Sequence, residues 1–72
     1  MAVLTLGSSG ANVTALQQAL QAAGFSPGAI DGQFGPGTQA AVLAFQNSAG
    51  LAADGIAGPQ TAAALGLAAA PP

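Results

Sequence analysis

The sequence predicts an all-α fold, a compact three-helix bundle. Three stretches carry apolar residues at helical spacing, and each one begins beside a helix-start residue and ends at a glycine. Two of these stretches follow the same pattern, D-G-x-x-G-P-x-T, which begins at Asp31 and again at Asp54. No stretch alternates apolar and polar residues as a half-buried strand would. Short extended pairing around Ile30 and Ile56, which occupy comparable places beside the repeated turns, remains open.

The first predicted helix begins at Ala11 and ends before Gly24. Val13, Leu16 and Leu20 are spaced i, i+3 and i+7, so they share one face of a helix that packs on the core. Glutamine is a good helix former and carries no charge. We therefore expect the wet face of this helix to be made by its glutamines, Gln17, Gln18 and Gln21.

The ends of this helix are marked by residues that favour helix caps. Ser9 or Gly10 is the expected N-cap. Gly24 is expected to end the helix in the left-handed conformation, with Phe25 as the apolar contact that often follows such a cap. Before the helix, a short extended arm is expected to lie on the core through the apolar residues Val3, Leu4 and Leu6.

The second and third predicted helices span residues 36–49 and 59–65, and both begin with the repeated pattern. Proline is favoured at the first helical position, where its missing N–H is not needed, and Gly35 and Gly58 precede it as N-caps. Gly50 and Gly66 are expected to end the two helices. The expected buried residues are Ala41, Val42, Phe45 and Ala49 in the second helix and Ala63, Ala64 and Leu65 in the third.

The repeated pattern first predicts a structural joint. Asp followed by Gly is typical of a turn in which the carboxylate accepts backbone N–H groups, and the following helix N-terminus favours a negative charge nearby. The threonines of the pattern, Thr38 and Thr61, fall at the third helical position, where a hydroxyl can satisfy first-turn backbone groups. We therefore interpret both aspartates mainly as turn residues.

Phe34 distinguishes the two copies, because Ala57 stands at the aligned place in the second copy. An aromatic side chain in a glycine-rich loop either fills the core or forms the wall of a ligand groove. We favour the core and keep the groove wall as the alternative. The first copy, which carries Phe34, is the better place to look for a ligand, and we expect the second copy to be mostly structural.

The composition excludes several function classes. The 72 residues contain no Lys, Arg, His or Cys and only two acidic side chains, so the net charge is −2. Without cations the chain cannot neutralise phosphates, which argues against nucleic acid and anionic membrane surfaces as partners. Neither an enzyme, a cofactor site nor a metal site is expected, because no His, Cys, Lys, Glu or Tyr is present. We also expect no disulfide, transmembrane helix or signal peptide.

At this point the order of the motifs resembles a known family. The sequence reads Val13-x-x-Leu16-Gln17, Gly24-Phe25, Asp31-Gly32-x-Phe34-Gly35-x-x-Thr38, Phe45-Gln46, Gly50-Leu51 and Asp54-Gly55-x-x-Gly58-x-x-Thr61. This closely resembles the peptidoglycan-binding domain of bacterial cell-wall hydrolases. The match covers nearly the whole chain, with residues 1–67 as the domain and 68–72 as a flexible C-terminal tail.

The resemblance implies a non-catalytic module that anchors a covalently linked hydrolase to peptidoglycan. Its natural relatives act outside the cell, in the cell wall or the periplasm. The partner would be peptidoglycan or its stem-peptide and glycan fragments. The candidate groove residues that the family motif implies are Asp31, Gly32, Phe34, Gly35, Thr38, Gln46 and Asp54.

The near absence of charged residues suggests a second hypothesis about the function of this chain. A typical domain is about 25% charged, whereas this chain is 3% charged. The alternative is therefore an engineered scaffold of reduced alphabet that keeps the fold but binds ligand weakly or not at all. Without Lys or Arg, a ligand carboxylate would lose charge-assisted hydrogen bonds of about 1.5–3 kcal/mol each.

Overall fold

The computed structural model describes residues 3–66, which form three helices, α1 (Ala11–Ala22), α2 (Pro36–Ala49) and α3 (Pro59–Leu65). Within this range no residue belongs to a strand longer than an isolated bridge. The all-α three-helix fold is thus confirmed, with the helix bounds that the sequence predicts. The predicted tail, 68–72, and the predicted domain boundary at residue 67 lie outside the described residues.

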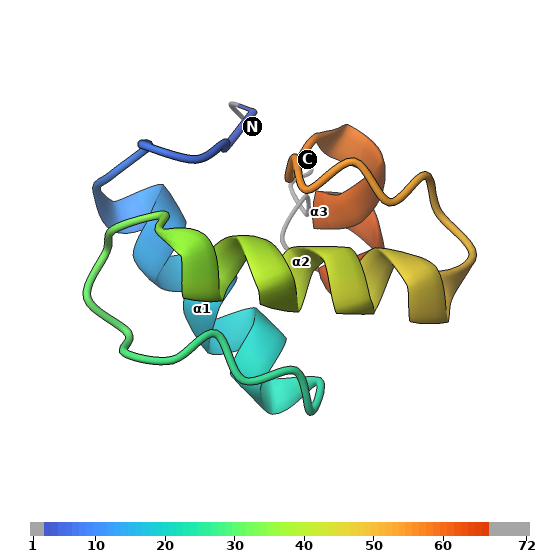
Figure 1. Ribbon diagram of the computed structural model, residues 1–72, viewed down its shortest axis with the longest axis horizontal. Helices are drawn as coiled ribbons and strands as arrows, with labels where there is room; N and C mark the ends of the chain where they lie inside the picture. The colour runs from blue at the N-terminus through green and yellow to red at the C-terminus, as the bar shows by residue number, and fades with distance from the viewer. Residues whose placement is uncertain (1–2, 67–72) are drawn as a thin grey trace.

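α1 is the central helix of the bundle and packs against both α2 and α3. In Figure 1, α2 crosses in front of α1, and α3 lies beside the C-terminal half of α2. The longest of these helices, α2, has 14 residues, and none of the described helices is long and apolar enough to cross a membrane.

The helix ends follow the capping rules that the sequence indicates. Gly10, Gly35 and Gly58 are the N-caps, and no side chain forms a capping hydrogen bond at these three helix starts. In α2 and α3 the fixed backbone geometry of Pro36 and Pro59 favours the start of the helix. α1 ends in a Schellman motif, because the N–H of Phe25 donates to the carbonyl of Leu20 at 2.8 Å. α2 ends in the same way with the N–H of Leu51 donating to Gln46 at 2.8 Å.

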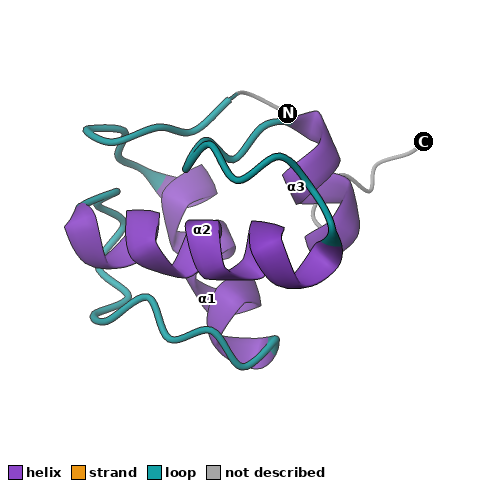
Figure 2. Ribbon diagram, turned by 45° about the vertical axis from the view of Figure 1, so that its right-hand side comes forward, coloured by secondary structure: helices purple, strands orange, loops and turns teal. Residues whose placement is uncertain are grey.

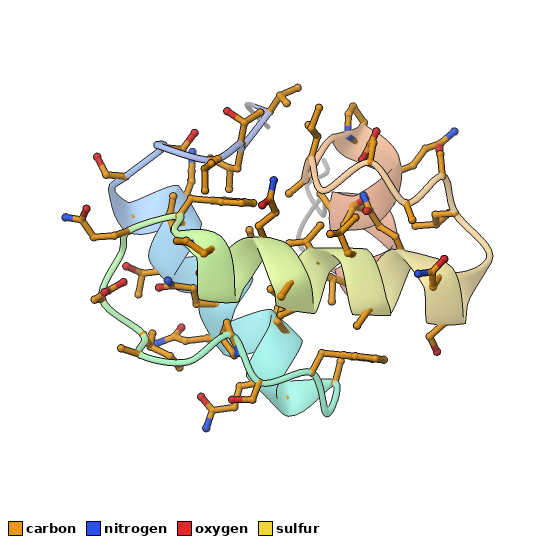
Figure 3. The ribbon with its side chains drawn as sticks, in the orientation of Figure 1. Atoms are coloured by element: carbon orange, nitrogen blue, oxygen red, sulfur yellow. The ribbon has the colours of Figure 1, made fainter. Side chains whose placement is uncertain are left out.

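The core is formed by side chains from all parts of the described chain (Figure 3). Phe25, just after α1, packs edge-on against Phe45 of the core with ring centroids 5.7 Å apart. The buried apolar residues are Leu4, Val13, Leu16, Leu20, Phe34, Ala41, Val42, Phe45, Ala57 and Ala62.

Several expected burials differ from the structure. Ala49 is exposed at the last turn of α2, and in α3 the buried positions are Thr61 and Ala62 while Ala63 and Ala64 face solvent. The reason is that α3 is oriented by the loop that precedes it and turns its first-turn threonine inward. Gln17 is the largest difference, since it is 0% exposed instead of forming the wet face of α1.

The N-terminal arm pairs with the two loops that precede α2 and α3. Figure 2 shows the arm and the loop before α3 at the upper side of the molecule. Leu4 and Ala57 exchange two backbone hydrogen bonds of 3.1 and 2.8 Å. Phe34, the residue aligned with Ala57, pairs with the same arm through Gly7 and Ser8 at 2.9 and 2.8 Å. The extended pairing therefore exists, but at positions 57 and 33–34 and not at Ile30 or Ile56, which are exposed.

Candidate functional site

The first D-G-x-x-G-P-x-T loop is organised around the side chain of Gln17, which enters it from α1. Gln17 Nε2 lies 2.9 Å from the carbonyl oxygen of Gln33, 3.0 Å from Thr38 Oγ1 and 3.2 Å from Asp31 Oδ1. Gln17 Oε1 in turn accepts the backbone N–H of Gly32 at 2.9 Å. One buried amide thus satisfies both ends of the turn and the start of α2, which is the condition for burying a polar side chain.

The second loop repeats this arrangement around Gln46 of α2. Gln46 Nε2 lies 2.9 Å from Asp54 Oδ1, 2.9 Å from the carbonyl oxygen of Ile56 and 3.0 Å from Thr61 Oγ1. The N–H of Gly55 donates to Gln46 Oε1 at 3.0 Å. The domain therefore contains two copies of one unit, a helix glutamine followed by a turn and a new helix, and α2 belongs to both.

The glycine after each aspartate gives the turn its shape. Gly32 has φ +74° and Gly55 has φ +73°, a left-handed conformation that residues with a side chain seldom adopt. This conformation directs the backbone N–H toward the buried glutamine oxygen. The described chain has no buried side-chain N or O atom without a hydrogen-bond partner, so both glutamine clusters are internally complete.

The threonines act differently from the prediction. No side chain forms a capping hydrogen bond at the start of α2 or α3. Instead, Thr38 and Thr61 are buried and their hydroxyl oxygens accept a hydrogen bond from the glutamine amide. The threonines therefore fasten each new helix to the preceding helix.

Each aspartate closes its own turn, as predicted. Asp31 Oδ1 accepts the N–H of Gln33 at 2.9 Å, and Asp54 Oδ1 accepts the N–H of Ile56 at 2.9 Å. These backbone donors, followed by the glutamine amides, lower the pKa of both carboxyl groups below the ordinary value of an aspartate. Both aspartates precede their helices, since the first turns of α2 and α3 contain no acidic residue.

The seven candidate residues separate into two hydrogen-bonded clusters, one helix N-cap and one core residue. Asp31, Gly32 and Thr38 meet around Gln17, whereas Gln46 and Asp54 belong to the second cluster. Gly35 is the N-cap of α2. Phe34 is only 2% exposed, so its ring fills the core, as favoured from the sequence, and offers no surface to a ligand.

Gln17 is the site residue that the sequence interpretation missed. Its position did carry a signal, because it is four residues after Val13 and three before Leu20, on the buried face of α1. Gln46 likewise follows the buried Val42 by four residues, on the buried face of α2. A glutamine within the apolar stripe, upstream of the Asp-Gly turn in both copies, is therefore the pattern that identifies these clusters.

Two surface pockets accompany the two loops. The larger, about 460 Å³, lies at the second copy and includes Val3, Leu51, Asp54, Ile56, Pro59 and Gln60 in its lining. The smaller, about 230 Å³, lies at the first copy beside Asp31, Gln33 and Thr38. Each pocket thus contains one of the two charged side chains of the protein. Among the described residues no group of His, Cys, Asp or Glu is arranged to hold a metal ion.

Sequence and structure comparisons point to one family. The chain is 59% identical over 63 residues to the zinc D-Ala-D-Ala carboxypeptidase of Streptomyces albus G, a match that covers 81% of this chain and 24% of that protein. Among solved structures, the SleB N-terminal domain superimposes with a TM-score of 0.86 at 44% identity, covering 89% of this chain and 88% of that one. A Burkholderia AP3 phage endolysin superimposes with a TM-score of 0.87 at 46% identity, covering 99% of this chain and 27% of that one.

The chain therefore spans about a quarter of the length of the carboxypeptidase that it matches. The alternative of an engineered scaffold finds no support in these similarities. Residues 9–65 match the profile of the family described as "Putative peptidoglycan binding domain". That range includes all three helices and both glutamine clusters, and the chain belongs to this peptidoglycan-binding domain family.

Proposed function

We propose that this chain is a non-catalytic module that binds peptidoglycan and holds a linked cell-wall hydrolase close to its substrate. Two observations support this proposal. The chain belongs to the peptidoglycan-binding family, and it matches only about a quarter of the carboxypeptidase and of the endolysin, as one module of a longer protein would. On this proposal, the module acts outside the cell, in the cell wall or the periplasm. The hydrolase is the covalent partner, and peptidoglycan is the ligand.

The observation that carries the proposal is the pocket of about 460 Å³ at the second loop. Pockets that bind small ligands are typically about 300–1,000 Å³. The second-copy pocket lies within that range, whereas the first-copy pocket, at about 230 Å³, lies below it. We therefore assign the main binding role to the second copy, with Gln46 and Asp54 as its site residues.

The preference for the first copy rested on Phe34, whose buried ring removes that reason. Asp31, Gly32, Gly35 and Thr38 are left with a structural role and at most a minor contact surface. In the second copy, the buried amide of Gln46 holds Asp54 and the carbonyl of Ile56 in fixed positions. A pocket wall that is rigid before binding loses less conformational entropy when the ligand arrives.

A catalytic role is not part of the proposal. The sequence contains none of the side chains that usually serve as a general base or an activated nucleophile apart from aspartate and hydroxyl groups. Its two aspartates line separate pockets, so they do not form a carboxylate pair. The hydroxyls of Thr38 and Thr61 are buried in the glutamine clusters.

The test is co-sedimentation of the purified domain with isolated peptidoglycan sacculi, with titration of soluble peptidoglycan fragments followed by NMR. We expect binding, with amide shifts at residues 51–61 that exceed those at residues 31–38. Gln60→Ala and Gln33→Ala form a matched pair, since both glutamines are exposed and line the larger and the smaller pocket respectively. Gln60→Ala should weaken binding to sacculi more than Gln33→Ala does. A folded domain that does not sediment with sacculi would overturn the proposed anchoring role, and one that also shows no shifts at millimolar fragment would leave only the alternative of a scaffold without a ligand.

A further inference from the structure

We propose that the second-copy pocket binds a protonated primary amine on the peptide part of peptidoglycan, and that Asp54 receives that ammonium group. This inference rests on the proposed function and names the chemistry that the site recognises. It follows from the position of the carboxylate, from the charges of the whole chain and from the side chains around the pocket.

The Asp54 carboxylate has one occupied oxygen and one that is open to a ligand. Oδ1 accepts hydrogen bonds from Gln46 Nε2 and from the N–H of Ile56, both at 2.9 Å. Within residues 3–66, no hydrogen bond reaches Oδ2. Asp54 is exposed and belongs to the pocket lining. The two bonds to Oδ1 fix the side chain, so Oδ2 is presented in one orientation to whatever enters.

The charge of the chain selects a cation. These 72 residues include no Lys, Arg or His, so none of their side chains can form an ion pair with Asp54. An aspartate is ionised at neutral pH, and the hydrogen bonds that lower the pKa of Asp54 favour its ionised form further. A ligand ammonium would form a charge-assisted hydrogen bond, whereas a ligand carboxylate would meet a like charge without any compensating cation.

The surrounding side chains favour a peptide over a sugar. Apolar contacts for small side chains come from Val3, Leu51, Ile56 and Pro59. Sugar rings are commonly held on the face of an exposed aromatic ring, and the pocket lining contains none. The three phenylalanines of the chain are buried or half-buried in the core. A short peptide with methyl side chains and one free amine therefore fits both the walls and the carboxylate.

The first experiment compares native sacculi with sacculi whose free amines have been acetylated, which turns each ammonium into a neutral amide. For the unaltered domain we expect acetylation to weaken binding by about twofold to fivefold, the size of an exposed ion pair. Asp54→Asn keeps an oxygen for Gln46 and Ile56, so it should fold. It should bind native sacculi as weakly as the unaltered domain binds acetylated sacculi, and acetylation should not weaken it further.

Asp31→Asn is the matched control, because Asp31 makes the same internal bonds at the smaller pocket. Asp31→Asn should bind like the unaltered domain and keep its sensitivity to acetylation. Equal binding of native and acetylated sacculi by the unaltered domain would overturn the inference while leaving the proposed function intact. So would an Asp54→Asn variant that responds to acetylation as strongly as the unaltered domain.

The second experiment does not depend on sacculi. Nα-acetyl-Lys-D-Ala-D-Ala and its Nα,Nε-diacetyl form differ only at Nε, where acetylation replaces the ammonium by a neutral amide. We expect the first peptide to shift the amides of residues 51–60 and to bind about twofold to fivefold more tightly than the second, with the difference falling as salt is added. Shifts with the charged peptide but no sedimentation with sacculi would contradict the proposed function alone. Identical behaviour of the two peptides would overturn the inference.

Discussion

Gln17 and Gln46 make the same four hydrogen bonds at two places in the chain. Each buried amide joins an aspartate, a loop carbonyl and a helix threonine, and each amide oxygen holds the N–H of the glycine that follows the aspartate. The spacing from glutamine to aspartate is 14 residues in the first copy and 8 in the second. The geometry of the cluster is thus independent of the length of the connection.

Replacing either buried glutamine should destabilise the domain. Gln17→Ala and Gln46→Ala each remove four hydrogen bonds and leave the buried N–H of Gly32 or Gly55 unsatisfied, for a loss of about 2–4 kcal/mol in the free energy of unfolding. Gln18→Ala, an exposed neighbour on α1, should change it by less than about 0.5 kcal/mol. Urea unfolding would measure both. Equal effects of Gln17→Ala and Gln18→Ala would contradict the cluster.

Phe34 provides a test of the assignment of its ring to the core. Phe34→Ala should lower the free energy of unfolding by about 3–5 kcal/mol, because a buried aromatic ring is lost. Phe34→Leu keeps most of the buried volume and should remain folded. If Phe34→Leu binds sacculi as the unaltered domain does, the ring is structural. A folded Phe34→Leu domain that has lost binding would instead place the ring in the ligand site.

Gly37 is a position where close packing should outweigh helix propensity. A Cβ at this residue would lie 3.0 Å from the carbonyl oxygen of Pro27, which is backbone and cannot move as freely as a side chain. Alanine favours a helix over glycine by about 1 kcal/mol, but the forced displacement costs about 1–3 kcal/mol. Gly37→Ala should therefore lower the melting temperature. A rise in melting temperature for Gly37→Ala would show that the loop around Pro27 yields to the added methyl group.

The stability of the domain should fall in acid, and the two aspartates should be responsible. Their folded-state pKa is lowered by hydrogen bonds to the ionised form, so their contribution is fully present above the unfolded pKa of about 3.9. It is lost as the pH falls from there through the lower folded-state pKa, because the unfolded chain binds protons first. Urea midpoints should drop over that interval and remain constant above it.

The double variant Asp31→Asn with Asp54→Asn tests this assignment, since asparagine has the same shape and does not titrate. Its urea midpoint should depend far less on pH than that of the unaltered domain. The sequence contains no other side chain that titrates in acid. An unchanged acid transition in the double variant would show that the chain termini, and not these carboxylates, cause it.

The local parts of the structure were predictable because they depend on a few neighbouring residues. Proline after glycine starts α2 and α3, and glycine in the left-handed conformation ends them, so the bounds 36–49 and 59–65 follow from the residues at those positions. The Asp-Gly turns are equally local, since Asp31 and Asp54 bond to backbone only two residues away. The family of the chain was also recognisable from these spacings.

The candidate site was predictable only in part. Asp54 and Gln46 were named from the sequence and meet in the structure at 2.9 Å. Gln17 was missed because glutamine is usually a surface residue, and only partners 14 to 21 residues away make its burial favourable. Which of the two loops has the larger pocket was likewise hidden, since Val3 of the arm and Leu51 of the connecting loop line it together.

By itself the sequence determined where each helix begins and ends and where the chain turns, because capping and turn formation act over two to five residues. Only the tertiary structure decided what the repeated turns are attached to. The N-terminal arm pairs with Ala57 and Phe34, and two buried glutamines bind the turns to the helices that precede them. Those contacts join residues far apart in the chain, and their stability comes from the exclusion of water in the assembled core, which no local pattern encodes.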